Sequence, residues 1–181
     1  MEANEVQELQ EHAEHAEHDK MMLPVALTMT VLAVLVAIVT VLGHRTHTEA
    51  IITQDKATDQ WNYYQAHKIR SNDTALTADL LSVLTIADKE AAKKIAKGYA
   101  DHQEKWAENL KEEQEQAEAL EAKVEKAEAR ADHYDLGEAL LEIGLVITSI
   151  TLLTHKRMYW FVGMVFSVVG IVAAVLGVLL K

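Results

Sequence analysis

The feature that most constrains this chain is a pair of long apolar segments, residues 21–43 and 158–180, that contain no charged side chain. Each segment has 23 residues, and about 20 helical residues rising about 1.5 Å each cross a hydrocarbon layer roughly 30 Å thick. Acidic rather than basic residues precede the first segment, and its apolar run is too long for a cleavable signal peptide. Both segments are therefore expected to anchor the chain in a bilayer.

A third apolar segment, residues 136–154, carries Glu138 and Glu142. If the membrane began only after Glu142, the remaining 12 residues would supply roughly 18 Å of helix, which is too short to cross. Glu142 is therefore expected to enter the hydrocarbon region. The basic turn 155–157 then joins the second and third spans into a helical hairpin.

Composition and charge bear on the remainder of the chain. It has one proline, seven glycines and no cysteine, so helix is favoured throughout and disulfides are excluded. Residues 44–135 carry 19 acidic and 13 basic residues, and the net charge of the chain is −11. Because nucleic-acid binding needs clustered positive charge, no nucleic-acid partner is expected.

These observations predict an all-α, polytopic membrane protein with three transmembrane helices. The first helix is residues 21–43, the second 136–154 and the third 158–181. An acidic His/Glu-rich segment, residues 1–20, comes before them. Residues 44–135 are predicted to form an extramembrane helical hairpin or coiled coil between the first and second spans. A chain reversal is expected at residues 71–74, where Ser71, Asn72, Asp73 and Thr74 favour turns and caps. Residues 88–90 are compatible with a helix cap, a kink or a continuous helix.

A five-heptad seam runs along the second half of this insertion, in alternating steps of three and four residues. Its apolar positions are Tyr99, Trp106, Leu110, Ala117, Leu120, Val124, Ala127, Ala131 and Tyr134. The polar exceptions are Gln103 and Glu113. A seam of this length needs a partner of similar length, and residues 44–70 cover only part of it, so self-association into a homo-oligomer is expected.

Small residues recur on one face of each apolar segment, a pattern that favours close helix packing in lipid. They are Ala26, Thr30, Ala33, Ala37 and Thr40 in the first segment, Gly137, Gly144, Thr148 and Thr151 in the second, and Gly163, Ser167, Gly170, Ala174 and Gly177 in the third. All three faces are predicted to be packing surfaces, within one subunit or between subunits.

No catalytic constellation is present, so an enzymatic activity is not expected. Glu138 and Glu142, with Ser149 further along the same face, favour assembly inside the membrane, with ion or proton handling and a simple interfacial position as the alternatives. The repeat with His12, His15 and His18 offers divalent-metal ligands, but the three imidazoles do not share one face of a regular helix. Apart from that possible metal, no cofactor is expected.

Two smaller features remain open. His44, His47 and Glu49 meet His133 or Asp135 if the two stems run side by side, although a plain polar membrane border is the favoured interpretation. The aromatic block Trp61, Tyr63 and Tyr64 is interpreted as packing between helices, with a partner-binding patch as the alternative.

The block around these aromatic residues, ATDQWNYYQAHKIR at residues 57–70, resembles an uncharacterised family of small bacterial helical membrane proteins known only as a domain of unknown function. Residues 4–8, residues 11–15 and the span ending at residues 41–45 are similar as well. The resemblance implies a bacterial membrane protein and supplies no activity, ligand or catalytic residue.

The sequence thus predicts a homo-oligomeric scaffold of the bacterial inner membrane. Its partners would be the lipid bilayer, further copies of itself and another membrane or extramembrane protein. The alternatives are an ion or proton conductor and a metal-binding membrane module. The short basic turn at residues 155–157 favours a cytoplasmic N-terminus, with residues 44–135 extracytoplasmic.

Overall fold

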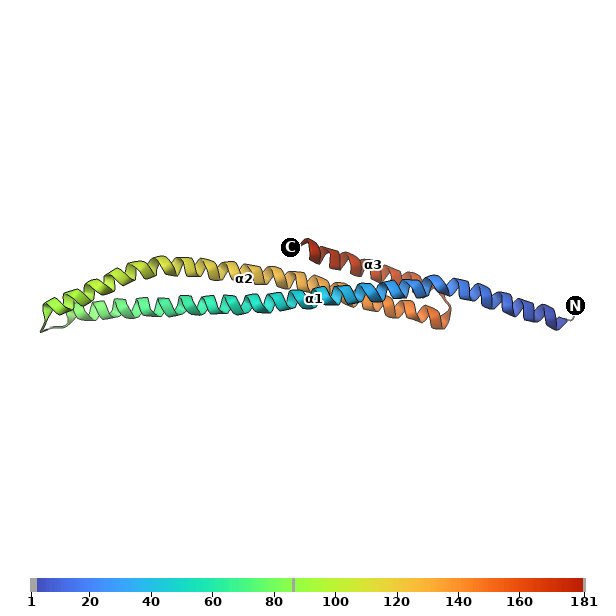
Figure 1. Ribbon diagram of the computed structural model, residues 1–181, viewed down its shortest axis with the longest axis horizontal. Helices are drawn as coiled ribbons and strands as arrows, with labels where there is room; N and C mark the ends of the chain where they lie inside the picture. Colours follow the sequence, from blue (N-terminus) through green and yellow to red (C-terminus); the bar gives the residue numbers. More distant parts are fainter. Residues whose placement is uncertain (1–2, 86, 181) are drawn as a thin grey trace. The chain divides into compact units, whose positions relative to one another are not determined.

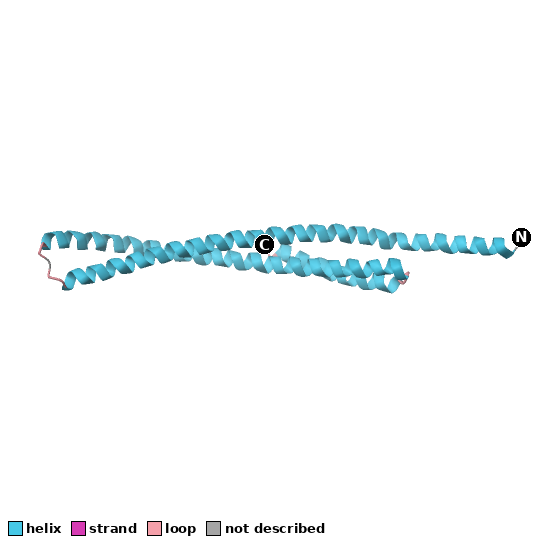
Figure 2. Cartoon of the chain, turned by 90° about the horizontal axis from the view of Figure 1, so that it is seen from below, coloured by secondary structure: helices cyan, strands magenta, loops and turns pink. Residues whose placement is uncertain are grey.

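The chain is almost entirely helical. The computed structural model describes the backbone of residues 3–85 and 87–180, and the side chains of residues 22–85, 87–103 and 105–180. Within these residues there are three helices and no strand: α1 (Ala3–Val83), α2 (Lys89–Thr154) and α3 (Arg157–Leu179) (Figures 1 and 2). The predicted all-α class is confirmed, and each helix contains a segment long and apolar enough to cross a membrane.

The chain reversal expected at residues 71–74 is wrong, because α1 continues through them to Val83. The hydroxyl groups that were expected to end the helix bond back to it instead. Thr74 Oγ1 donates to the carbonyl oxygen of Arg70 at 2.7 Å, and Thr77 Oγ1 donates to that of Asp73 at 2.7 Å. A threonine whose hydroxyl bonds the carbonyl four residues earlier is compatible with a helix interior.

The reversal lies instead between Val83 and Lys89. Asp88 is the N-cap of α2, since its carboxylate oxygen Oδ1 accepts a hydrogen bond of 3.0 Å from the backbone N–H of Ala91. Of the three alternatives left open at residues 88–90, the structure thus selects the helix cap.

The connection between α2 and α3 is short. It consists of His155 and Lys156, and His155 adopts a left-handed backbone conformation with φ 54°. A left-handed residue directly after the last helical turn is a common way to end a helix. The next helix begins at Arg157 without a side-chain cap.

The chain divides into two compact units, which are described separately. Unit 1 consists of Met1–His47 and Lys126–Lys181, and unit 2 of Thr48–Glu125. In unit 1, α1, α2 and α3 pack around a cluster of buried or partly buried apolar residues: Leu32, Leu35, Val36, Val39, Leu42, Tyr134, Leu141, Leu145 and Ala174. In unit 2, α1 and α2 form a two-helix hairpin, with Ala50, Ala57, Ala117 and Val124 buried.

Both units pair α1 with α2 in antiparallel fashion. In unit 2, residue 71 contacts residue 103, residue 67 contacts 113, and residue 61 contacts 121, so that rising numbers on α1 meet falling numbers on α2. In unit 1, residue 40 contacts residue 138 and residue 47 contacts 135. α3 returns along α2, since Gly163 lies beside Gly144 and Gly170 lies beside Gly137.

Candidate functional site

One end of the apolar part of unit 1 is marked by a polar contact. The ring nitrogen Nε2 of His47 lies 3.0 Å from Oδ2 of Asp135 and donates to this carboxylate. Both side chains are about half exposed. One turn before His47, a β-carbon added at Gly43 would lie at ordinary van der Waals distance from Tyr134 and Asp135. The stems therefore do run side by side here, and the contact predicted as an open alternative for His47 is present.

Glu138 lies one helical turn further into the apolar segment. Its Oε1 accepts a hydrogen bond of 2.6 Å from Oγ1 of Thr40, and the contact is partly buried. The same hydroxyl lies 3.0 Å from the carbonyl oxygen of Val36 on its own helix. The contact links α1 to α2 in a largely apolar environment, where the loss of one partner leaves a polar group unsatisfied.

Glu142 behaves differently from Glu138. Its side chain is exposed, and it has no hydrogen bond or ion pair to any residue that the structure describes. It follows Asp135 by seven residues, which places it roughly 10 Å deeper along α2 than the polar contact at His47. Ser149, predicted to continue this face, is half-buried and bonds the carbonyl oxygen of Val146 at 2.7 Å.

The small residues of α2 and α3 meet each other directly. A β-carbon at Gly144 would lie 2.8 Å from the carbonyl oxygen of Gly163, and one at Gly170 would lie 2.8 Å from that of Gly137. Real β-carbons do not come this close, so the two backbones touch without room for side chains. The small residues of these two segments are all buried: Gly137, Gly144, Thr148, Thr151, Gly163, Ser167, Gly170, Ala174 and Gly177.

The buried hydroxyls at this contact are mostly satisfied within their own helices. Thr148 Oγ1 donates to the carbonyl oxygen of Gly144 at 2.7 Å, and Ser167 Oγ donates to that of Gly163 at 2.8 Å. Thr151 is fully buried, and its hydroxyl has no partner among the described residues. These hydroxyls therefore do not connect into a polar chain along the helix contact.

The small-residue face of the first segment is not used inside the chain. Ala26, Thr30, Ala33 and Ala37 are exposed, and of this set only Thr40 is partly buried. The first segment turns Val25, Leu32 and Val39 inward instead, seven residues apart. The reason is the shape of the surface it covers: α2 and α3 are already in backbone contact, so large aliphatic side chains on α1 fill the space beside them.

The seam of α2 has a partner within the chain. In the part of the seam that belongs to unit 2, Ala117 and Val124 are buried, and Tyr99, Trp106, Leu110 and Leu120 are half-buried. The rest, Ala127, Ala131 and Tyr134, is buried in unit 1. Because α1 extends to Val83, it is long enough to face the unit 2 part of the seam. The length argument for self-association, which assumed that α1 ended near residue 70, is therefore wrong.

A polar pair that the sequence analysis missed lies inside this hairpin. Nδ1 of His67 is 2.5 Å from Oε1 of Glu113, and the side chains are 27% and 17% exposed. Near them, Nε2 of Gln60 donates to Oε1 of Gln116 at 3.1 Å. The sequence feature that indicated this pair was Glu113, a carboxylate at a seam position that normally carries an apolar residue.

The aromatic block is only partly a packing element. Trp61 and Tyr64 are half-buried, with ring centroids 5.5 Å apart in an edge-to-face arrangement. The indole N–H of Trp61 donates to Oε1 of Glu121 on α2 at 2.8 Å. Tyr63 does not take part in this packing, since its side chain is 63% exposed.

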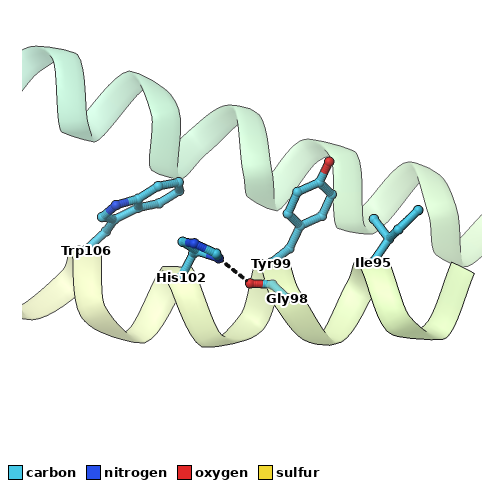
Figure 3. A pocket seen from close by; sticks show the side chains of 5 residues that line it. All are labelled: Ile95, Gly98, Tyr99, His102 and Trp106. Carbon is cyan, nitrogen blue, oxygen red and sulfur yellow. Dashed lines mark hydrogen bonds between the residues drawn. The ribbon is translucent and has the colours of Figure 1, made fainter. Parts of the chain in front are cut away.

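An apolar hollow of about 480 Å³ lies on α2 in unit 2 and is lined by Ile95, Gly98, Tyr99, His102 and Trp106. Figure 3 shows Tyr99 and Trp106 directed from α2 toward the neighbouring helix, and His102 bonded to the carbonyl oxygen of Gly98. Nothing in the hollow resembles a catalytic pair. Two of its members, Tyr99 and Trp106, are seam residues that pack loosely here.

Metal ligation is not supported in the described part of the chain, which contains no group of three or more His, Cys, Asp or Glu side chains placed to hold an ion. The side chains of His12, His15 and His18 lie outside the described residues, so the metal prediction stays a prediction.

These features define a class: an all-helical protein with three segments suited to crossing a membrane and a charged helical hairpin between the first two. The chain belongs to the family described as a domain of unknown function, DUF4337, whose family model matches residues 21–180. The resemblance to an uncharacterised family is thereby confirmed. No curated protein and no solved structure matches the chain at a significant level.

Proposed function

We propose that this chain is a non-enzymatic membrane scaffold that associates with further copies of itself through its apolar segments and presents its charged hairpin to other molecules. The observation that carries the proposal is Glu142, an exposed carboxyl group in the apolar part of α2 that has no partner among the described residues. Four residues earlier, Glu138 has such a partner in Thr40. The two carboxyl groups therefore have different roles.

A carboxyl group that faces lipid is costly, and ionisable groups in membrane segments normally face another protein surface or water. A second copy of the chain would supply a protein surface for Glu142. Hydroxyl and amide groups that bond across helices in a membrane contribute about 1–2 kcal/mol at most. One such contact is enough to bias association without dominating it.

The second support is the small-residue face of the first segment. Ala26, Thr30, Ala33 and Ala37 are exposed in the described chain and repeat at four, three and four residues. Small side chains let helix backbones approach closely, and lipid gives purely apolar helices little other reason to associate. Because this face makes no close helix contact within the described chain, we expect it to contact a helix of another copy.

The arrangement favours a scaffold over an ion or proton conductor. Conduction needs a continuous line of polar groups or water, but Glu138 is engaged by Thr40 and the α2–α3 contact has no space between its glycines. The hydroxyls of Thr148 and Ser167 bond their own helices. Nothing among the described residues extends the carboxyl pair into a path.

The proposal is tested by measuring the mass of the purified chain in lipid nanodiscs. We expect an oligomer for the unaltered protein and a roughly tenfold weaker association for Glu142→Leu. The control is Glu108→Leu, which removes an exposed carboxylate of the charged hairpin and should leave association unchanged. A monomeric unaltered protein would overturn the proposal. So would Glu142→Gln abolishing proton flux in liposomes while the assembly persists, because that result identifies a conductor.

A further inference from the structure

The tip of the unit 2 hairpin exposes an apolar face that none of the described residues covers. At the end of α1, the side chains of Leu80, Val83 and Leu84 are 49%, 77% and 61% exposed. With Leu76 they are spaced four, three and one residues apart, which places them on one side of the helix end. The tip is the turn that joins α1 to α2 (Figure 1).

Basic side chains are concentrated directly beside this face. The first nine residues of α2, residues 89–97, contain four of the 17 basic residues of the chain and one acid. Lys89, Lys93 and Lys97 follow at four-residue intervals and so share one side of α2. Lys93 lies 3.6 Å from Glu90, but both side chains are largely exposed, and such pairs contribute little.

The remainder of α2 in unit 2 has the opposite charge. Residues 98–125 contain nine acids and three bases. A negatively charged surface would therefore attract the tip and repel the rest of this helix. The positive charge is local, at one end of the hairpin, and it coincides with the exposed apolar side chains.

The two features meet at one hollow, where Leu84 lies beside Lys89 and Lys93. A shallow hollow of about 400 Å³ is lined by apolar and basic residues from both sides of the turn: Leu81, Leu84, Thr85, Lys89, Ala92 and Lys93. Apolar side chains that enter the acyl boundary and lysines that meet the phosphates are the combination by which proteins bind an anionic lipid interface.

From this geometry we infer that the tip of the hairpin docks on the surface of an anionic lipid bilayer. Val83 and Leu84 enter the interface, and the four lysines meet its phosphate groups.

The residue types favour lipid over a protein partner. All four basic residues are lysines, whose ammonium groups act as compact point charges, whereas arginine is favoured for the fixed two-pronged recognition of carboxylates in protein interfaces. A fluid surface with a diffuse negative potential attracts lysines without requiring fixed partners, at about a fivefold gain in binding for each residue near the surface.

The test uses the full chain in nanodiscs made of zwitterionic lipid. They are mixed with vesicles that contain either roughly 30% anionic phosphatidylglycerol, which gives the vesicle surface a negative potential, or no anionic lipid. Co-flotation with the anionic vesicles is expected, with little binding to the zwitterionic ones and with loss of binding as salt is raised. Replacing Lys89, Lys93, Lys94 and Lys97 by Gln should weaken binding about 600-fold, the product of four fivefold losses.

The matched control replaces Lys105, Lys111, Lys123 and Lys126 by Gln, which removes the same charge from elsewhere on α2 and should leave tip binding in place. For the apolar part, Val83→Ser with Leu84→Ser should weaken binding, whereas Ile51→Ser with Ile52→Ser removes two exposed isoleucines far from the tip and should not.

Equal binding to both vesicle types, no binding at all, or equal effects of the two lysine sets would overturn the inference. So would saturable binding of the tip to a protein that persists at high salt while vesicles remain unbound.

Discussion

At the scale of single residues, four glycines determine how closely α2 approaches α3. Gly137 and Gly144 on α2 lie against Gly170 and Gly163 on α3, and an added β-carbon at any of them would approach the opposite backbone to 3 Å or less. The spacing of these glycines was visible in the sequence, and the structure brings them together. These glycines matter because they have no side chain, and two helix backbones touch only where no side chain separates them.

Replacing Gly144 by alanine is expected to destabilise unit 1. The new β-carbon would meet the carbonyl oxygen of Gly163 at 2.8 Å and the side chain of Ser167, and backbone has no easy way to move aside. We expect a loss of about 1–3 kcal/mol in the free energy of unfolding. It is measured by titrating the protein in mild detergent with a denaturing detergent and following its circular dichroism.

The control for this change is Gly43→Ala in the same unit. There the added β-carbon lies 3.5 Å from Asp135 Oδ1 and 3.6 Å from Tyr134 Cβ, which is ordinary contact. Stability should stay unchanged or rise by up to about 1 kcal/mol, because alanine restricts the unfolded chain more than glycine does. Equal losses at both positions would contradict the close approach assigned to Gly144.

At the scale of elements, the length of α1 changes the interpretation of the hairpin. A helix that ran only to residue 70 would leave much of the α2 seam without a partner, but α1 runs for 81 residues to Val83. Local propensity at residues 71–74 favoured a turn, and the packing of Thr74, which is buried, overrides it. Within unit 2 the contact between the two helices then consists of small buried residues and a few polar pairs.

The His67–Glu113 pair is expected to hold the two helices of unit 2 in register. We expect a coupling free energy of about 1–3 kcal/mol between His67→Ala and Glu113→Ala, because the pair is largely shielded from water and hydrogen bonds to charged groups are stronger than neutral ones. The measurement is a double-mutant cycle on the free energy of local opening, from hydrogen exchange of the amides near both residues.

The comparison pair is Lys111 and Glu115, which lie 3.9 Å apart on the surface of α2 with both side chains mostly exposed. Its coupling should stay below about 0.5 kcal/mol. If the two pairs give similar coupling, His67 and Glu113 are an ordinary surface pair and the assignment of register to them fails.

At the scale of the whole molecule, the hairpin tip and the α2–α3 turn lie on opposite sides of the membrane if all three candidate spans cross it. The chain has no cysteine, so Ser82→Cys at the tip and Thr154→Cys beside the turn each create a unique label site. Both positions are exposed. A maleimide that cannot cross membranes should label only one of them in intact cells.

We expect that one to be Ser82→Cys, because the short turn with Lys156 and Arg157 favours the cytoplasmic side. Labelling of Thr154→Cys alone would reverse the orientation and keep three crossings. Labelling of both variants from the same side would contradict the three-crossing arrangement itself.

The helical class, the three apolar segments and the positions of the close-packing glycines on α2 and α3 were available from the sequence alone. Each depends on local content: apolar length, residue spacing along one helix, and the small size of glycine. The resemblance carried by residues 57–70 likewise needed no structure. The sequence left open which residue of one helix contacts which residue of another.

Only the tertiary structure determined which residues of different helices contact each other. It paired Glu138 with Thr40 and left Glu142 without a partner among the described residues. It also turned Val25, Leu32 and Val39 inward in place of the small residues of the first segment, and it placed Lys89 and Lys93 beside the exposed side chain of Leu84. The physical reason is that a helix has several faces of similar apolar character. Which face is buried depends on the space that its neighbours leave, and no single segment contains that information.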